Sequence, residues 1–106
     1  MKLQMHSVHF DADQKLIDHI QVRMDKLETF YDRFVDGEVI LRLEKDDSNL
    51  NKLVEVKINI PRNQLFAKER AQTFEVATDL AFEGLRRQLK KFKEKQNQKT
   101  LDKRAL

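Results

Sequence analysis

The segment Val54-Glu55-Val56-Lys57-Ile58-Asn59-Ile60 alternates apolar and polar side chains without a break. Such alternation with a period of two is typical of a β-strand that buries one face and exposes the other. Pro61-Arg62-Asn63 follows as a turn, and we expect a weaker strand from Leu65 to Ala71 after it. The segment therefore predicts an antiparallel sheet with one solvated face, which carries Glu55, Lys57 and Asn59.

Two further strands are expected earlier in the chain. Residues Leu3 to Phe10 have strand-like spacing, with a change of parity near Ser7 that predicts a bulge. Asp36-Gly37 is a turn signal, and Val39 to Glu44 is expected to form the second strand after it. The polar loop 45–49 then leads into the third strand.

Two helices complete the predicted order βαβββα. The first is expected to begin at an N-cap on Asp13, with Asp11 as the alternative, and to end near Phe30. The second is expected from near Thr73 to about Gln96, because apolar side chains recur there at helical spacing. We therefore expect an α+β fold in which both helices pack on one face of a four-stranded, mostly antiparallel sheet.

Length and composition indicate one small domain. A chain of 106 residues has room for a single core, and we expect residues 1–96 to form it and residues 97–106 to be a basic, flexible tail. The chain has no cysteine, which excludes a disulfide framework and thiolate chemistry. Neither a membrane span of about 18 apolar residues nor the apolar core of a signal peptide is present, so we expect a cytoplasmic protein.

The sequence lacks the patterns of a catalytic or metal site. His6 and His9 are expected on opposite faces of a strand, and His19 on the polar side of the first helix. Two glycines are too few for a phosphate-cradling loop, and neither serine lies in a glycine-flanked elbow. We therefore expect no enzyme, no metal, no other cofactor and no small-molecule substrate.

Positive charge is concentrated at the C-terminal end. From Gly84 onward nine Lys and Arg residues stand against two acidic ones, a net of +7, whereas residues 1–83 hold twelve basic and sixteen acidic residues, a net of −4. In the second helix an apolar stripe is flanked on one side by Arg86, Lys90 and Lys93, and on the other by Arg87, Lys91 and Lys95. A helix that is basic on both sides of an apolar stripe suits the binding of a polyanion.

The first helix offers further basic side chains. If the two helices pack side by side, Arg23 and Lys26 extend the basic surface of the second helix into a groove suited to an RNA phosphate backbone. Aromatic rings available for stacking on bases are scarce, and Phe66 is either exposed or part of the core. We predict that RNA is bound mainly through its phosphates, by Arg23, Lys26, Arg86, Arg87, Lys90, Lys91, Lys93 and Lys95.

Several segments match a known family in the same order along the chain. They are Lys26-Leu27-Glu28, Tyr31-Asp32-Arg33, Val39-Ile40-Leu41, Ala77 with Asp79, and the basic run from Leu85 to Lys91 followed by Lys93 and Lys95. This pattern resembles the ribosome hibernation promoting factors and the related ribosome-associated inhibitor, over nearly the whole chain. The sequence departs from the family at Thr73-Phe74-Glu75, where the family has Asp-Met-Tyr, and at Gly84, where it has lysine.

The resemblance implies the βαβββα fold and a non-catalytic translation inhibitor. Such a protein binds the small ribosomal subunit and its rRNA at the decoding centre and silences idle ribosomes. The chain resembles a short form of the family, without the linker and dimerisation domain of longer members, so we expect a monomer off the ribosome. Two alternatives are a general double-stranded RNA-binding module and a protein adaptor whose acidic body, residues 1–83, binds a basic partner.

Overall fold

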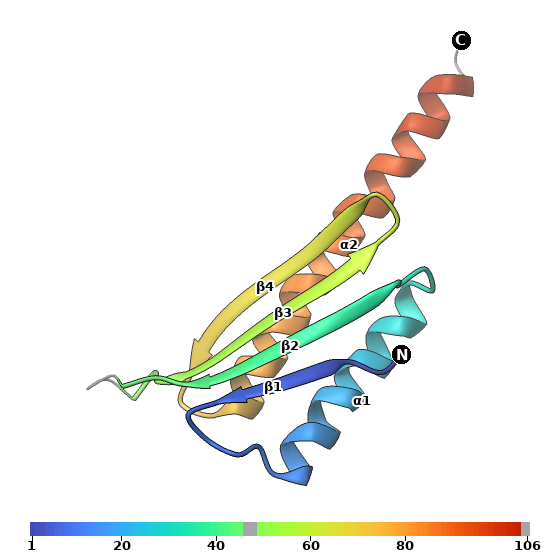
Figure 1. Cartoon of the computed structure of the whole chain (residues 1–106). Coiled ribbons are helices and arrows are strands. Elements are labelled where there is room, and N and C mark those ends of the chain that lie inside the picture. The colour runs from blue at the N-terminus through green and yellow to red at the C-terminus, as the bar shows by residue number, and fades with distance from the viewer. Residues whose placement is uncertain (46–48, 105–106) are drawn as a thin grey trace.

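The computed structural model describes residues 1–45 and 49–104, and their side chains as far as Lys95 (Figure 1). The order of elements is βαβββα, which confirms the predicted fold class. The elements are β1 (Gln4–Val8), α1 (Gln14–Phe30), β2 (Asp36–Leu43), β3 (Lys52–Ile60), β4 (Asn63–Ala71) and α2 (Phe74–Arg104).

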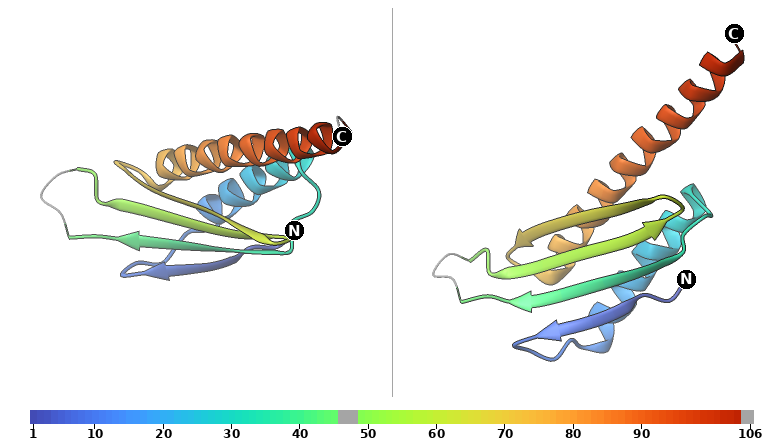
Figure 2. Two further views of the ribbon diagram at one scale, coloured as in Figure 1. Left: turned by 90° about the horizontal axis from the view of Figure 1, so that it is seen from above. Right: turned by 45° about the horizontal axis from the view of Figure 1, so that its top comes forward.

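The four strands form one sheet in the order β1-β2-β3-β4. β1 runs parallel to β2, and the other two pairs are antiparallel, so the sheet is mostly antiparallel as predicted. The parallel pair requires a crossover, and α1 supplies it. Both helices lie on the same face of the sheet and pack beside each other (Figure 2).

The core lies between this sheet face and the helices. Val54, Val56, Ile58 and Ile60 of β3 are all buried, whereas Lys57 and Asn59 between them are exposed, so the alternation in the sequence correctly indicates which face is solvated. The helices complete the core with side chains at helical spacing, which are Leu16, Ile20, Met24 and Leu27 from α1 and Ala77, Ala81, Leu85 and Leu89 from α2.

The predicted helix starts are confirmed by their caps. The Asp13 carboxylate accepts a hydrogen bond from the Leu16 N–H at 2.8 Å, so Asp13 and not Asp11 is the N-cap of α1. Thr73 lies just before α2, and its hydroxyl accepts a hydrogen bond from the Val76 N–H at 3.1 Å.

The N-terminal strand differs from its prediction. Pairing from Gln4 opposite Glu38 to Val8 opposite Arg42 is uninterrupted, so the bulge predicted near Ser7 is wrong. The parity changes instead at His9, whose positive φ of 69° turns the chain after β1 has ended. This turn places the Phe10 ring on that of Phe74, with a centroid separation of 4.4 Å.

The turn predicted at Asp36-Gly37 is also wrong, because both residues belong to β2. Asn59 on the neighbouring strand donates a hydrogen bond to the Asp36 carboxylate at 2.5 Å. A Cβ on Gly37 would lie 2.6 Å from Leu3 Cδ2, so this glycine lets the N-terminal segment approach the sheet closely.

Helix α2 extends to Arg104, past the predicted end at about Gln96, and projects beyond the sheet (Figure 1). No glycine or proline follows Gly84 that would end the helix. The flexibility predicted for residues 97–106 concerns a segment whose side chains lie outside the described residues.

Gly84 itself is not required by close packing, since a Cβ there would meet Arg87 and Ala67 at 3.8 and 3.9 Å, which are ordinary contacts.

Candidate nucleic-acid interface

A groove of about 400 Å³ runs between α1 and α2. Arg23 and Lys26 line it from α1, and Arg86 lines it from α2 together with Phe82 and Glu83. The packing of the two helices side by side therefore brings three of the eight predicted basic residues together, as the sequence analysis anticipated. We call this feature the interhelical groove.

Asp79 on α2 holds two basic side chains of α1. Its Oδ1 accepts a hydrogen bond from Arg23 Nε at 2.6 Å and lies 2.8 Å from His19 Nε2. Partial burial is the largest single effect on the pKa of Asp79, and by itself it would raise that pKa. The hydrogen bonds and charges of Arg23 and His19 together outweigh burial, so the pKa of Asp79 lies below its ordinary value of 3.8. The ionised carboxylate therefore joins the two helices and fixes the position of Arg23 in the interhelical groove.

We expect Asp79→Asn to lower the free energy of unfolding near neutral pH by about 1 kcal/mol, because the amide cannot replace a carboxylate shared by two basic groups. Since the pKa of Asp79 is lower in the folded than in the unfolded chain, its contribution is present above the ordinary value of 3.8 and is lost as pH falls through the folded value. The difference in urea-unfolding free energy between wild type and variant should therefore shrink in acid.

Asp25→Asn is the matched control for this measurement. Asp25 also lies on a helix surface, but among the described residues its side chain accepts only a local hydrogen bond, from Gln21 four residues away, at 2.9 Å. We expect its replacement to change stability by less than about 0.5 kcal/mol at any pH. Equal effects of the two substitutions would contradict a stabilising role for the contact between Asp79 and α1.

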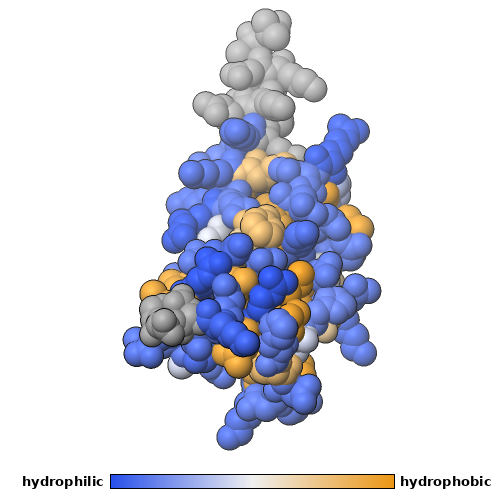
Figure 3. Space-filling view, turned by 60° about the vertical axis from the view of Figure 1, so that its left-hand side comes forward, coloured by the Kyte–Doolittle hydropathy of each residue, from blue (hydrophilic) through white to orange (hydrophobic). Residues whose placement is uncertain are grey.

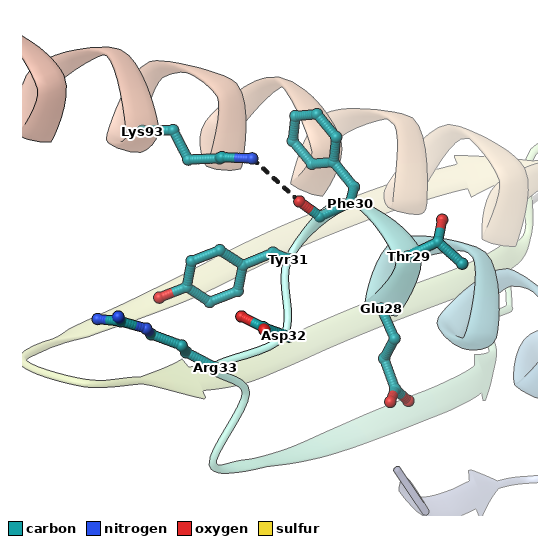
Figure 4. Close-up of a pocket in the computed structure, with 7 residues that line it drawn as sticks. All are labelled: Glu28, Thr29, Phe30, Tyr31, Asp32, Arg33 and Lys93. Carbon is teal, nitrogen blue, oxygen red and sulfur yellow. Dashed lines mark hydrogen bonds between the residues drawn. The ribbon is translucent and has the colours of Figure 1, made fainter.

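Two cations of α2 contact the C-terminal end of α1. Lys93 Nζ donates a hydrogen bond to the Phe30 carbonyl at 3.1 Å and lies 4.4 Å from the centroid of the Phe30 ring. The Arg86 guanidinium lies 5.4 Å from the same centroid. Figure 4 shows Lys93 at the edge of a hollow of about 410 Å³ that Tyr31 and Arg33 also line. Lys93 therefore has a structural contact in addition to its predicted role.

Arg87 and Lys91 lie on the opposite side of α2. They line a hollow of about 360 Å³ against β4, together with Lys68 of that strand. The eight predicted residues therefore do not form one surface, because α2 presents basic residues both to the interhelical groove and to the β4 side. Lys90 and Lys95 are exposed on α2.

Sequence reasoning missed Arg33 and Lys68 as members of this basic surface. Arg33 appeared only among the residues that carry the family resemblance, and Lys68 was not singled out within the strand predicted from Leu65 to Ala71. Both become neighbours of α2 through contacts between distant parts of the chain, which no local pattern predicts.

The sheet face away from the helices carries charges of both signs, and several of them form ion pairs. Arg70 binds Glu44 at 2.8 Å, and Lys68 lies 3.7 Å from Glu55 across neighbouring strands. In contrast, no ion pair within the described residues involves Lys26, Arg86, Arg87, Lys90 or Lys91. Hydrophilic side chains dominate the face of the molecule in Figure 3, with smaller apolar areas between them. The uncompensated positive charge of these five residues belongs to α2 at four positions and to α1 at Lys26.

Residues 1–45 and 49–104 offer neither a membrane-spanning helix nor a cluster of metal ligands. No helix in this part of the chain is long and apolar enough to cross a membrane. The same residues contain no group of three or more His, Cys, Asp or Glu side chains that could hold a metal ion.

A comparison of the chain with known protein families finds a match. The model of the Sigma 54 modulation protein / S30EA ribosomal protein family matches residues 3–97. The chain belongs to this family. The resemblance inferred from the sequence is thereby confirmed.

Curated members of the family cover most of the chain. A ribosome hibernation promoting factor of Pseudomonas putida is 30% identical over 96 residues, which are 91% of this chain and 90% of the relative. A ribosome hibernation promotion factor of Bacillus subtilis is 29% identical over 101 residues, covering 93% of this chain but 52% of that longer relative.

Solved structures of similar proteins have the same fold. A ribosomal subunit interface protein from Coxiella burnetii superimposes with a TM-score of 0.78 at 20% identity, over 89% of this chain and 99% of that one. The N-terminal domain of Protein Y from Thermus thermophilus gives a TM-score of 0.72 at 18% identity, over 87% and 99% of the two chains. At these identities the likeness establishes the fold alone.

The departures of this S30EA family member lie at Thr73, just before α2, and on α2 itself. Glu75 is exposed in the first turn, where its negative charge is favourable beside the helix N-terminus. Gly84 lies in the hollow on the β4 side, next to Arg87. Neither departure changes the buried stripe of α2, so the position of the helix on the sheet does not depend on them.

Proposed function

We propose that this protein is a non-catalytic translation inhibitor that binds the small ribosomal subunit in its decoding region and silences idle ribosomes. The observation that carries the proposal is the uncompensated positive charge of α2 beside the interhelical groove. Membership of a family whose curated relatives are named ribosome hibernation factors supports the ribosome as the polyanion. This role would place the protein in the cytoplasm with the ribosomes.

Phosphate contacts account best for the chemistry of the groove. Arg23, Lys26 and Arg86 line the groove from two helices, so they present cations to a nucleic-acid backbone that lies along it. Arg23 is held by Asp79, so part of the binding surface is ordered before the ligand arrives. The proposed partner is therefore rRNA of the small subunit, bound mainly through its backbone by a protein that is monomeric off the ribosome.

The decoding region is the finer part of the proposal. The solved neighbour from Coxiella burnetii is named a ribosomal subunit interface protein, which supports a site on the face of the small subunit that meets the other subunit. A protein bound in the decoding region would occupy the path of mRNA and of the tRNA anticodon. Inhibition would then follow from steric exclusion, without any chemical step.

Sedimentation through sucrose gradients tests this proposal directly. Purified protein should migrate with small subunits and with intact ribosomes, should be released as salt rises, and should suppress translation in a cell extract. Small subunits that already carry mRNA and tRNA should bind it much more weakly. Absence of the protein from all ribosomal fractions at low salt would refute the proposal.

The same preparation separates the two alternatives. A general double-stranded RNA-binding module would bind any RNA duplex about as tightly as it binds ribosomes. A protein adaptor would retain its partner after RNase treatment. Binding that prefers small subunits over a plain duplex and that is lost on RNase treatment would support the ribosomal role.

A further inference from the structure

Phe66 is an exposed aromatic residue on a strand that is otherwise regular. It lies on the edge strand β4, and 41% of it is accessible to solvent. Its neighbours Leu65 and Ala67 are buried against the helices, so the ring lies on the outer face of the sheet. This settles the alternative left open by the sequence, because Phe66 is not part of the core.

Four basic residues lie on the elements next to Phe66, two on the neighbouring positions of the sheet and two on α2. Lys57 lies directly opposite Phe66 on β3, and Lys68 follows it by two residues on the same face of β4. Arg87 and Lys91 of α2 line the hollow at the edge that Phe66 and Lys68 also border. Two acids lie nearby, Glu55 paired with Lys68 at 3.7 Å and Glu69 in the lining of the hollow, so the cations outnumber the acids.

The backbone that carries the ring is fixed by α2. The side-chain amide of Gln88 accepts a hydrogen bond from the Phe66 N–H at 3.2 Å and donates one to the Phe66 carbonyl at 2.6 Å. An extended peptide that added to the β4 edge would need these two backbone groups, so their engagement disfavours such a partner. The ring is thus held in place without being covered.

We infer that Phe66 is a stacking platform for one unpaired base of a single-stranded RNA segment, whose phosphates are bound by Lys68, Arg87 and Lys91. Four-stranded sheets with helices on one side can bind single-stranded RNA by stacking bases on aromatic residues of the open face. One ring can stack on one base, and the flanking cations can bind the phosphates next to it. The stacking contact does not depend on the identity of the base, because every base has a π-face.

This site deepens the proposed function and rests on it for the source of the RNA. The interhelical groove and the Phe66 site lie on different sides of α2, so they would contact different RNA segments. The Phe66 site also explains why Arg87 and Lys91 carry uncompensated charge although they lie outside the groove.

A short single-stranded oligoribonucleotide containing 2-aminopurine tests the inference, because stacking quenches the fluorescence of this base. Wild type should bind the oligonucleotide and quench it. Phe66→Leu should weaken binding about tenfold and abolish the quenching, since leucine keeps an apolar side chain but has no π-face. Phe66→Tyr should retain both, and circular dichroism should show that all variants are folded.

Val22→Ala is the matched control, since Val22 is an apolar side chain on α1 with 53% exposure. It should leave both affinity and quenching unchanged. The double variant Lys68→Gln, Lys91→Gln should bind the oligonucleotide more weakly and with a smaller salt dependence. The 2-aminopurine fluorescence should still be quenched in any complex that forms. These results together would separate the stacking contact from the phosphate contacts.

Unchanged quenching in Phe66→Leu would overturn the inference, as would a wild-type protein that sediments with ribosomes but does not bind the oligonucleotide. In both cases the proposed ribosomal function would still stand. Failure of the wild-type protein to sediment with ribosomes would instead refute the proposed function, whatever the oligonucleotide shows.

Discussion

Changing Lys26, Arg86 and Lys90 together to glutamate should abolish co-sedimentation of the protein with ribosomes. Lys26 and Arg86 line the interhelical groove, and Lys90 is an exposed cation about one turn after Arg86 on α2. None of the three has an ion-pair partner among the described residues. If each contributes about 1.5 kcal/mol through a charge-assisted contact with phosphate, the triple change weakens binding by on the order of 10³-fold. Arg23 is left unchanged because glutamate there would face Asp79 and perturb the fold.

The control reverses three charges elsewhere on the molecule. Lys2, Arg42 and Arg62 are all exposed and lie outside the groove and the Phe66 site, and their replacement by glutamate changes the net charge by the same amount. We expect this variant to sediment with ribosomes nearly as wild type does. Equal losses in the two triple variants would mean that binding depends only on net charge, and retention of the groove variant would refute the assigned surface.

A second triple variant tests the β4 side of α2. It changes Arg87, Lys91 and Lys95 to glutamate. We expect this set to weaken ribosome binding as well, because both sides of the helix are proposed to contact rRNA. If the β4-side set had no effect while the groove set abolished binding, the rRNA-binding residues would be confined to the interhelical groove.

Leu85→Ala should lower the free energy of unfolding by about 3 kcal/mol, the largest effect on stability that we expect from one substitution. Leu85 is fully buried between α2 and the sheet, and alanine would leave a cavity that the rigid surroundings fill only in part. Small domains are commonly stable by about 5–15 kcal/mol, so the variant should still fold at low temperature but unfold at much lower urea concentration.

Leu80→Ala makes the same chemical change in the same helix. Leu80 is 39% exposed, so its truncation should cost well under about 1 kcal/mol. Urea denaturation followed by circular dichroism measures both values. Similar losses in the two variants would show that the stripe containing Leu85 does not anchor α2 to the sheet, and the basic residues would then lack a fixed position.

The sequence was most informative where one local pattern determined the outcome. The alternation from Val54 to Ile60 predicted which sheet face is buried, and the helical positions of Arg86 and Arg87 placed them on different sides of α2. The N-cap at Asp13 was predictable for the same reason, since it depends on a hydrogen bond only three residues along the chain.

Features that depend on distant residues were not predictable. The role of Gly37 depends on the approach of Leu3, and the Asp79 contact joins residues 56 positions apart in the sequence. Phe66 remained ambiguous because its neighbours Leu65 and Ala67 are also apolar, so the local pattern does not show which of the three faces the core until the packing of the helices is known. The end of α2 was misplaced since no residue after Gln96 gives a strong stop signal.

The concentration of positive charge at one end of the chain has a kinetic consequence. Because the residues from Gly84 onward carry a net charge of +7 and residues 1–83 a net charge of −4, the electric field of the protein is one-sided, with its positive end at α2. A molecule with such one-sided charge turns toward a polyanion before contact, which favours productive collisions. Association should therefore be fast at low ionic strength and slow down steeply as salt is added, whereas the dissociation rate of the bound state should change less.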